Sequence, residues 1–253
     1  ENRVKLGFQR VNVVGAGLAG SEAALLLARA GVSVRLFEQK PEHRTPAAVS
    51  TKAAELVCSN SLRSNNPLNA VGLIKEELRR LDSPLLALAE TAAVPAGDAL
   101  AVDRELFSQA VEAALEGEPL IERICAQVDG WESDDNPWVL ATGPLTAEAL
   151  AERLRKEVGG SCAFYDAVAP IVEADSIDRE IVYALSRYGK GEGADYLNIP
   201  LDRDDYERFI NAVTDAPKVT PHAFEKMKYF EGCLPLETVV ERGAESLRFG
   251  AMK

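Results

Sequence analysis

The chain has 253 residues with a formal net charge of −12, and 47% of its residues are apolar. This length suits one large domain or two modest ones, and the acidic balance disfavours a generally basic surface for nucleic acid. No apolar run reaches the length that spans a bilayer and the polar first residues lack a signal-peptide core, so we expect a cytoplasmic protein without membrane contact.

The first elements in chain order predict a dinucleotide-binding turn. An apolar strand at 11–14 runs into a glycine-rich turn and then into an alanine-rich helix. Gly15 permits the tight turn out of the strand, Gly17 lets backbone approach a pyrophosphate, and Gly20 lets the helix pack closely on the sheet. The helix N-terminus directs unpaired N–H groups and the positive end of its dipole at the phosphates.

An acidic residue closes this unit. The second strand, at 32–37, is followed by Glu38, about twenty residues beyond the turn, where a carboxylate accepts both hydroxyls of an adenosine ribose. The carboxylate also disfavours a 2′-phosphate, because two negative charges would meet. The pattern therefore predicts NAD or FAD as the ligand, with an ordinary structural turn as the alternative.

Helical spacing continues after a polar loop. Ser83 is expected to cap one helix, with Pro84 at its first position. Helices are predicted at 68–81, 85–91 and 105–115, and a strand at 121–128.

A further strand runs into Ala141-Thr142-Gly143. In flavoproteins of the glutathione-reductase type, a strand that ends in these three residues lies beside the dinucleotide turn. The alternative is a turn of small residues between a strand and a helix. Together with the glycine turn, the pattern predicts an α/β fold with a Rossmann-like FAD-binding domain of the glutathione-reductase type.

The composition becomes loop-like at 186–193, and we place a domain boundary there. Residues 1–185 are predicted to form the FAD-binding domain. Residues 186–253 are predicted to form a second, smaller α+β domain of the insertion type, which would bind substrate and which contains a helix at 202–213.

Four scattered cysteines form no C-x-x-C pair, so neither a metal site nor a disulfide is expected. Cys58 and Cys233 stand in polar loops with basic residues nearby in the sequence, a setting in which a thiol becomes reactive. Cys125 and Cys162 lie in apolar, strand-like contexts and are interpreted as packing residues. The alternative for Cys58 and Cys233 is also a buried, inert thiol.

Longer blocks occur in order over nearly the whole chain, among them Glu55-Leu56-Val57-Cys58-Ser59-Asn60-Ser61-Leu62-Arg63-Ser64 and Phe230-Glu231-Gly232-Cys233-Leu234-Pro235. With these blocks, the glycine turn and Ala141-Thr142-Gly143, the chain resembles the folate- and FAD-dependent tRNA uracil-5 methyltransferases, the glucose-inhibited-division-like flavoproteins. Members of that family usually continue beyond the Arg-Phe-Gly block at 248–250. We therefore expect a C-terminally shortened member or a fragment.

The resemblance implies FAD as cofactor, methylenetetrahydrofolate and NAD(P)H as co-substrates, and tRNA as the substrate methylated at uracil C5. It implies Cys233 as the thiol that adds to C6 of uracil and Cys58 as the thiol that handles the C5 proton, with an exchange of these roles left open. The cofactor-binding residues expected from the turn and the resemblance together are Gly15, Ala16, Gly17, Ala19, Gly20, Glu38, Asn60, Ser61, Arg63, Thr142 and Gly143.

Two other functions stay open on the sequence. One is a shortened flavin-binding oxidoreductase or ligand-binding protein that has lost RNA methyl transfer. The other is a nucleotide-binding scaffold whose cysteines are inert.

Overall fold

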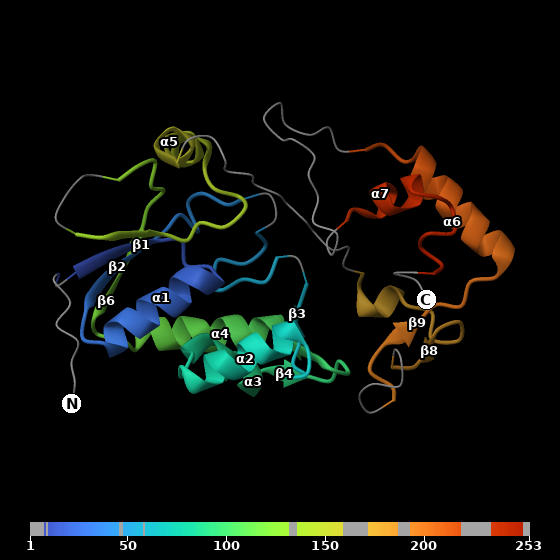
Figure 1. The fold of residues 1–253 in the computed structure, drawn as a ribbon, viewed down its shortest axis with the longest axis horizontal. Helices are drawn as coiled ribbons and strands as arrows, with labels where there is room; N and C mark the ends of the chain where they lie inside the picture. Colours follow the sequence, from blue (N-terminus) through green and yellow to red (C-terminus); the bar gives the residue numbers. More distant parts are fainter. Residues whose placement is uncertain are drawn as a thin grey trace. The chain divides into compact units, whose positions relative to one another are not determined.

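The computed structural model describes residue 8 and the ranges 10–45, 48–57, 59–131, 136–158, 172–186, 193–218 and 234–249 (Figure 1). The chain divides into two compact units. The first consists of Glu1–Ala169 with Ser186–Tyr196, and the second of Pro170–Leu185 with Leu197–Lys253. The division predicted from composition, 1–185 and 186–253, stays a prediction, because a compact unit is not by itself a domain that folds alone.

A four-stranded parallel sheet, in the order β6-β2-β1-β7, organises the first unit. Val13 in the middle of the sheet lies opposite Leu36 on one side and Val139 on the other. Such strands are rich in Val, Leu and Ile because a parallel sheet is normally covered on both faces. The four strands are β1 (Arg10–Val14), β2 (Ser33–Glu38), β6 (Ile121–Cys125) and β7 (Trp138–Leu140).

The strand order reverses at β1. The chain proceeds from β1 to β2 and β6 on one side, and β7 then pairs with β1 on the other side. In open parallel sheets a reversal of this kind leaves a crevice beyond the carboxyl ends of the strands, where ligands bind. The predicted α/β class and its Rossmann-like arrangement are therefore confirmed.

Two helices lie on opposite sides of this sheet, α1 (Leu18–Arg29) and α5 (Glu148–Val158) (Figure 1). Helix α1 packs on the sheet through small buried residues such as Ala24, which let its axis approach the strands. Helix α4 (Arg104–Glu116) adds the buried Phe107 and Val111 to the same core.

A smaller antiparallel sheet has the order β3-β5-β4. Its strands are β3 (Ser61–Ser64), β4 (Ala93–Val94) and β5 (Ala99–Val102). Helix α3 (Pro84–Thr91) precedes β4, and the Ser83 hydroxyl accepts the Leu86 amide at 3.2 Å. The predicted start of this helix, with a serine cap and proline at the first position, is confirmed.

Helix α2 (Ala70–Arg80) is shorter than the predicted range of 68–81. It begins later because the Asn69 side chain accepts the Gly72 amide at 2.9 Å and thereby caps the first turn. It ends before Asp82, whose φ of +53° lies outside the helical region.

Strand β6 ends at Cys125, although the sequence predicts a strand to residue 128. Its partner β2 ends at Glu38, directly opposite Cys125, so the ladder has no strand to continue along. The interpretation of Cys125 as a packing residue is wrong, because this thiol is exposed at the end of the strand.

The regular secondary structure of the second unit is mostly helical where the structure describes it. Helix α6 (Arg203–Asp215) matches the predicted helix at 202–213, and Asp202 caps it by accepting the Asp205 amide at 2.8 Å. A small core joins Ile210 to Val240 and Leu247. The other elements are η1 (Ala174–Ser176), β8 (Tyr183–Ala184), which pairs with β9 (Leu197–Asn198), and α7 (Leu236–Glu241).

Within the described ranges, no helix combines the length and the apolar character that crossing a membrane would require.

Candidate dinucleotide site

Tight packing shapes the inner side of the glycine turn, toward the sheet. Gly15 has a φ of +95°, and a Cβ atom on it would lie 2.7 Å from the Ala141 carbonyl oxygen. A Cβ atom on Gly20 would come closer to the Gly15 carbonyl oxygen than real Cβ contacts allow. Both positions therefore require glycine, one for its backbone conformation and both for space.

The outer side of the turn is open. Apart from Gly17 itself and the adjoining residues of the chain, no atom of the described residues lies within 4 Å of the place where a Cβ atom on Gly17 would stand. Gly17 precedes the first turn of α1, where the structure shows neither a side-chain cap nor an acidic residue. The first amides of α1 and the positive end of its dipole are thus available to an anion.

Glu38 lies beside this opening, at the end of β2. Its Oε2 accepts the Ala16 amide at 2.9 Å, and its Oε1 accepts the Lys40 amide at 3.0 Å. A carboxylate has about four lone-pair sites, so two remain for the hydroxyls of a ribose. This arrangement fits an adenosine diphosphate group.

The Ala141-Thr142-Gly143 turn lies next to the glycine turn, as predicted. The Ala141 amide donates to the Val14 carbonyl at 2.9 Å and so extends the pairing of β7 with β1. The Thr142 hydroxyl is 2.6 Å from that of Thr146, which donates to the Gly143 carbonyl at 2.8 Å. A role of Thr142 and Gly143 in cofactor binding stays a prediction.

Three of the predicted residues lie at the small antiparallel sheet. Ser61 and Arg63 belong to strand β3, and Asn60 directly precedes it. Asn60 joins β3 to β5, because its side-chain amide donates to the Val102 carbonyl at 3.1 Å. The Ser61 hydroxyl accepts the Arg63 amide at 3.0 Å, at a register irregularity of β3 where Arg63 has a φ of +67°. These contacts show how the sheet is held, and the predicted contact with a cofactor stays a prediction.

Cys58 and Cys233, the two predicted catalytic thiols, lie outside the described residues. Their assigned roles therefore stay predictions.

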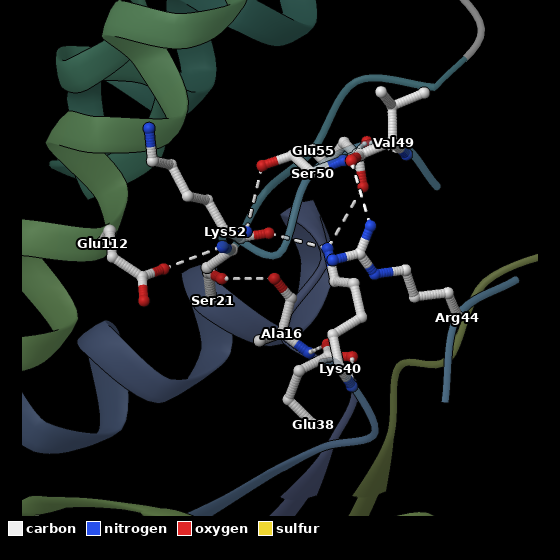
Figure 2. A network of polar contacts seen from close by, with 11 residues as sticks. Ala16, Ser21, Glu38, Lys40, Arg44, Val49, Ser50, Lys52, Glu55 and Glu112 are labelled. Carbon is white, nitrogen blue, oxygen red and sulfur yellow. Dashed lines mark hydrogen bonds and ion pairs between the residues drawn. The ribbon is translucent and has the colours of Figure 1, made fainter. Parts of the chain in front are cut away.

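A segment that sequence reasoning missed lies against the turn. Figure 2 shows Ala16 between Glu38 and the stretch 48–55. The Ala16 carbonyl accepts the Ala54 amide at 2.8 Å and the Ser21 hydroxyl at 3.2 Å. The Lys40 ammonium donates to the Lys52 carbonyl at 2.7 Å. Charged residues in a polar loop are the only sequence signal of this arrangement.

Lys75 was also missed, because it falls on the polar side of a helical pattern. It is buried, and its ammonium donates to the Ser64 carbonyl at 2.8 Å. Burial lowers the pKa of Lys75, and the positive charges of Arg79 and Arg63 lower it further. Lys75 therefore stabilises the end of β3 through its hydrogen bond to Ser64.

A surface hollow of about 290 Å³ lies near Arg29, at the C-terminal end of α1. A helix of 12 residues is roughly 18 Å long at 1.5 Å per residue. The hollow is therefore separate from the glycine turn at the other end of α1.

Comparisons with known proteins agree with the family resemblance of the sequence. The family model "Glucose inhibited division protein A" matches residues 10–253. The chain is 58% identical to methylenetetrahydrofolate–tRNA-(uracil-5-)-methyltransferase TrmFO of Anaeromyxobacter dehalogenans, over 98% of this chain and 55% of that protein. It is 54% identical to the Myxococcus xanthus protein of the same name, over 97% of this chain and 53% of that protein. The chain thus spans about half the length of the curated relatives it matches.

Among solved structures, p-nitrophenol 4-monooxygenase PnpA of Pseudomonas putida DLL-E4 is similar with a TM-score of 0.39 and 17% identity, over 60% of this chain and 44% of that one. This similarity is too low to support an inference about function.

Proposed function

The chain belongs to the glucose-inhibited division protein A family, and from that premise we propose that it takes part in FAD-dependent methylation of uracil C5 in tRNA, with methylenetetrahydrofolate as carbon donor. The observation that carries the proposal is the 58% identity to a protein named for this activity, over 98% of the chain. At that level of identity a change of reaction class would be unusual, although the chain spans about half of that protein.

The glycine turn supports the cofactor part of the proposal. The open side of Gly17 and the uncapped start of α1 suit a pyrophosphate, and Glu38 suits the adenosine ribose. We propose that NAD(P)H would reduce the bound flavin, which would then supply the hydride that converts the folate-derived methylene carbon on uracil C5 into a methyl group. In this proposal the glycine turn and Glu38 bind the adenosine diphosphate half of the cofactor.

Cys233 is proposed as the thiol that activates the base. A thiolate that adds to C6 of uracil makes C5 nucleophilic, because the ring becomes an enolate. Cys58 is proposed to take the proton from C5. Both assignments rest on the resemblance of the blocks around these residues.

A second candidate is a flavin-binding oxidoreductase or ligand-binding protein without RNA methyl transfer. The net charge of −12 favours it, because affinity for RNA depends largely on basic groups that neutralise phosphates.

One assay separates the two candidates. The 253-residue chain is saturated with FAD and incubated with unmodified tRNA, NADPH and methylenetetrahydrofolate labelled in its methylene carbon. The proposal expects label in 5-methyluridine, and a Cys233→Ala variant should keep the flavin but lose the label. Bound flavin without label in the unsubstituted chain would favour the second candidate, and failure to bind flavin would reject both.

A further inference from the structure

A closed ring of polar contacts surrounds the base of the glycine turn (Figure 2). The Ala16 amide donates to Glu38, and the Lys40 amide donates to the other oxygen of the same carboxylate. The Lys40 ammonium donates to the carbonyl of Lys52 in the segment 48–55. The amide of Ala54, in the same segment, donates to the Ala16 carbonyl. Ala16 and Glu38 are therefore connected by two routes, one direct and one through the segment.

Lys40 is held at three points of this ring. Its amide donates to Glu38, its carbonyl accepts the Cys125 thiol at 3.2 Å, and its ammonium donates to the Lys52 carbonyl and to Glu55. The backbone of Lys40 thus orients the ribose-binding carboxylate while its side chain holds the segment 48–55.

Glu55 organises the segment from within. Its Oε1 accepts the amides of Val49 and Ser50, each at 2.7 Å, and its Oε2 is 3.2 Å from the Lys40 ammonium. The Val49 side chain is 84% exposed, so apolar packing does not hold this end of the segment. The ion pair is well shielded, with side chains 11% and 13% exposed, and therefore less screened than a surface pair.

The geometry points to Lys40 and Glu55 as positioning residues of the dinucleotide site. Through the segment 48–55 they hold the Ala16 backbone and the Glu38 carboxylate in the arrangement that receives the ribose of an adenosine dinucleotide. This inference rests on the dinucleotide-binding part of the proposed function.

A direct contact of Lys40 with a phosphate is the competing role. It is disfavoured because the Lys40 side chain is mostly buried and its ammonium already donates to Glu55 and the Lys52 carbonyl. The two roles predict opposite results for Glu55→Gln. If Lys40 binds phosphate, loss of the Glu55 charge frees the ammonium and strengthens binding. If the pair positions the site, the same substitution weakens binding.

The test measures dissociation constants of ADP and FAD by titration calorimetry, with the 253-residue chain as it stands. Lys40→Met and Glu55→Gln should each weaken ADP binding about tenfold, and the double variant should be no weaker than the single ones, as expected for residues of one network. Lys40→Arg should restore most of the affinity. Hydrogen exchange at Val49 and Ser50 should accelerate in the two single variants even without ligand.

A second ion pair on the same segment provides the matched control. The side chain of Lys52 pairs with Glu105 of α4 at a more exposed position, and only the backbone carbonyl of Lys52 belongs to the ring. Lys52→Met and Glu105→Gln should therefore leave ADP binding within about twofold, the scale of a surface ion pair.

The outcomes distinguish this inference from the proposed function. If the unsubstituted chain binds ADP but Glu55→Gln binds it equally or more tightly, the positioning role is overturned and the proposed function stands. If the unsubstituted chain binds neither ADP nor FAD, the dinucleotide site itself is rejected and this inference with it. Loss of methylation with unchanged ADP affinity in Lys40→Met would also overturn the positioning role.

Discussion

The two sides of the glycine turn differ in how they are filled. On the inner side, Gly15 and Gly20 are pressed against backbone atoms, so that even one methyl group would collide. On the outer side, Gly17 faces open space and Glu38 keeps acceptor capacity beyond its two backbone donors. The inner side is thus filled by the protein's own backbone, whereas the outer side is the space that we assign to a ligand, so substitutions should separate stability from binding.

The largest effect is expected at Gly20. Gly20→Ala places a methyl group against the Gly15 carbonyl and should lower the free energy of unfolding by about 3 kcal/mol or more, at the upper end for overpacked sites. Gly17→Ala is the matched control, since its φ of −72° suits any residue, and it should cost only about 0.5–1 kcal/mol because alanine is a poorer N-cap than glycine. Denaturant unfolding followed by circular dichroism measures both, and equal losses would contradict the comparison.

Gly17→Val should abolish ADP and FAD binding and lower the free energy of unfolding by only about 1 kcal/mol, the cost of a poorer N-cap. The branched side chain would occupy the space that we assign to the pyrophosphate, while no described atom of the protein lies in its way. Flavin content after incubation with excess FAD and the unfolding curve of the same sample provide the measurement. Full flavin occupancy in this variant would show that the turn does not bind the pyrophosphate.

Glu38→Ala should weaken ADP binding by about 1–3 kcal/mol, the scale of a hydrogen bond to a charged group. The same substitution should also reduce the ratio by which the chain prefers ADP to ADP that carries a 2′-phosphate, because the Glu38 carboxylate no longer repels that phosphate. Competition titrations with the two nucleotides measure both effects. An unchanged preference would mean that the carboxylate does not face the ribose.

The smallest effect concerns Lys75, away from the turn. Its pKa is lowered in the folded state, whereas the unfolded chain regains the ordinary value of 10.5. Between these two values the unfolded state binds more protons, so the free energy of unfolding rises with pH. Lys75→Met should remove this rise and leave ADP affinity at neutral pH unchanged.

The free energy of unfolding of the unsubstituted chain and of Lys75→Met is measured at several pH values in the alkaline range. The same pH dependence in both would contradict the lowered pKa of Lys75. A loss of ADP affinity in Lys75→Met would instead connect Lys75 to the binding side of the turn and weaken the comparison.

Much of the glycine turn, on both of its sides, could be predicted from sequence. The spacing of Gly15, Gly17, Gly20 and Glu38 lies within a single strand–helix–strand unit, whose geometry is largely local. The serine cap and the proline at the start of α3 were likewise predictable, because a capping hydrogen bond spans three residues. Helix and strand ends were less predictable, since β6 ends where its distant partner β2 ends.

The ring around Ala16 was not predictable. The chain has 28 basic and 40 acidic side chains, so opposite charge alone gives Lys40 many candidate partners besides Glu55. Solvent exposure of Cys125 was missed for a similar reason, because an apolar neighbourhood in sequence does not reveal where a ladder stops.

The amino-acid sequence by itself determined the α/β class, the dinucleotide turn and the acid that accompanies it, because short-range sterics and hydrogen bonds specify these features. Tertiary structure alone decided that the segment 48–55 bonds back to Ala16 and that the pairing of β6 with β2 stops at Cys125. Such contacts join residues far apart in the chain, and their choice depends on the packing of all the intervening elements at once.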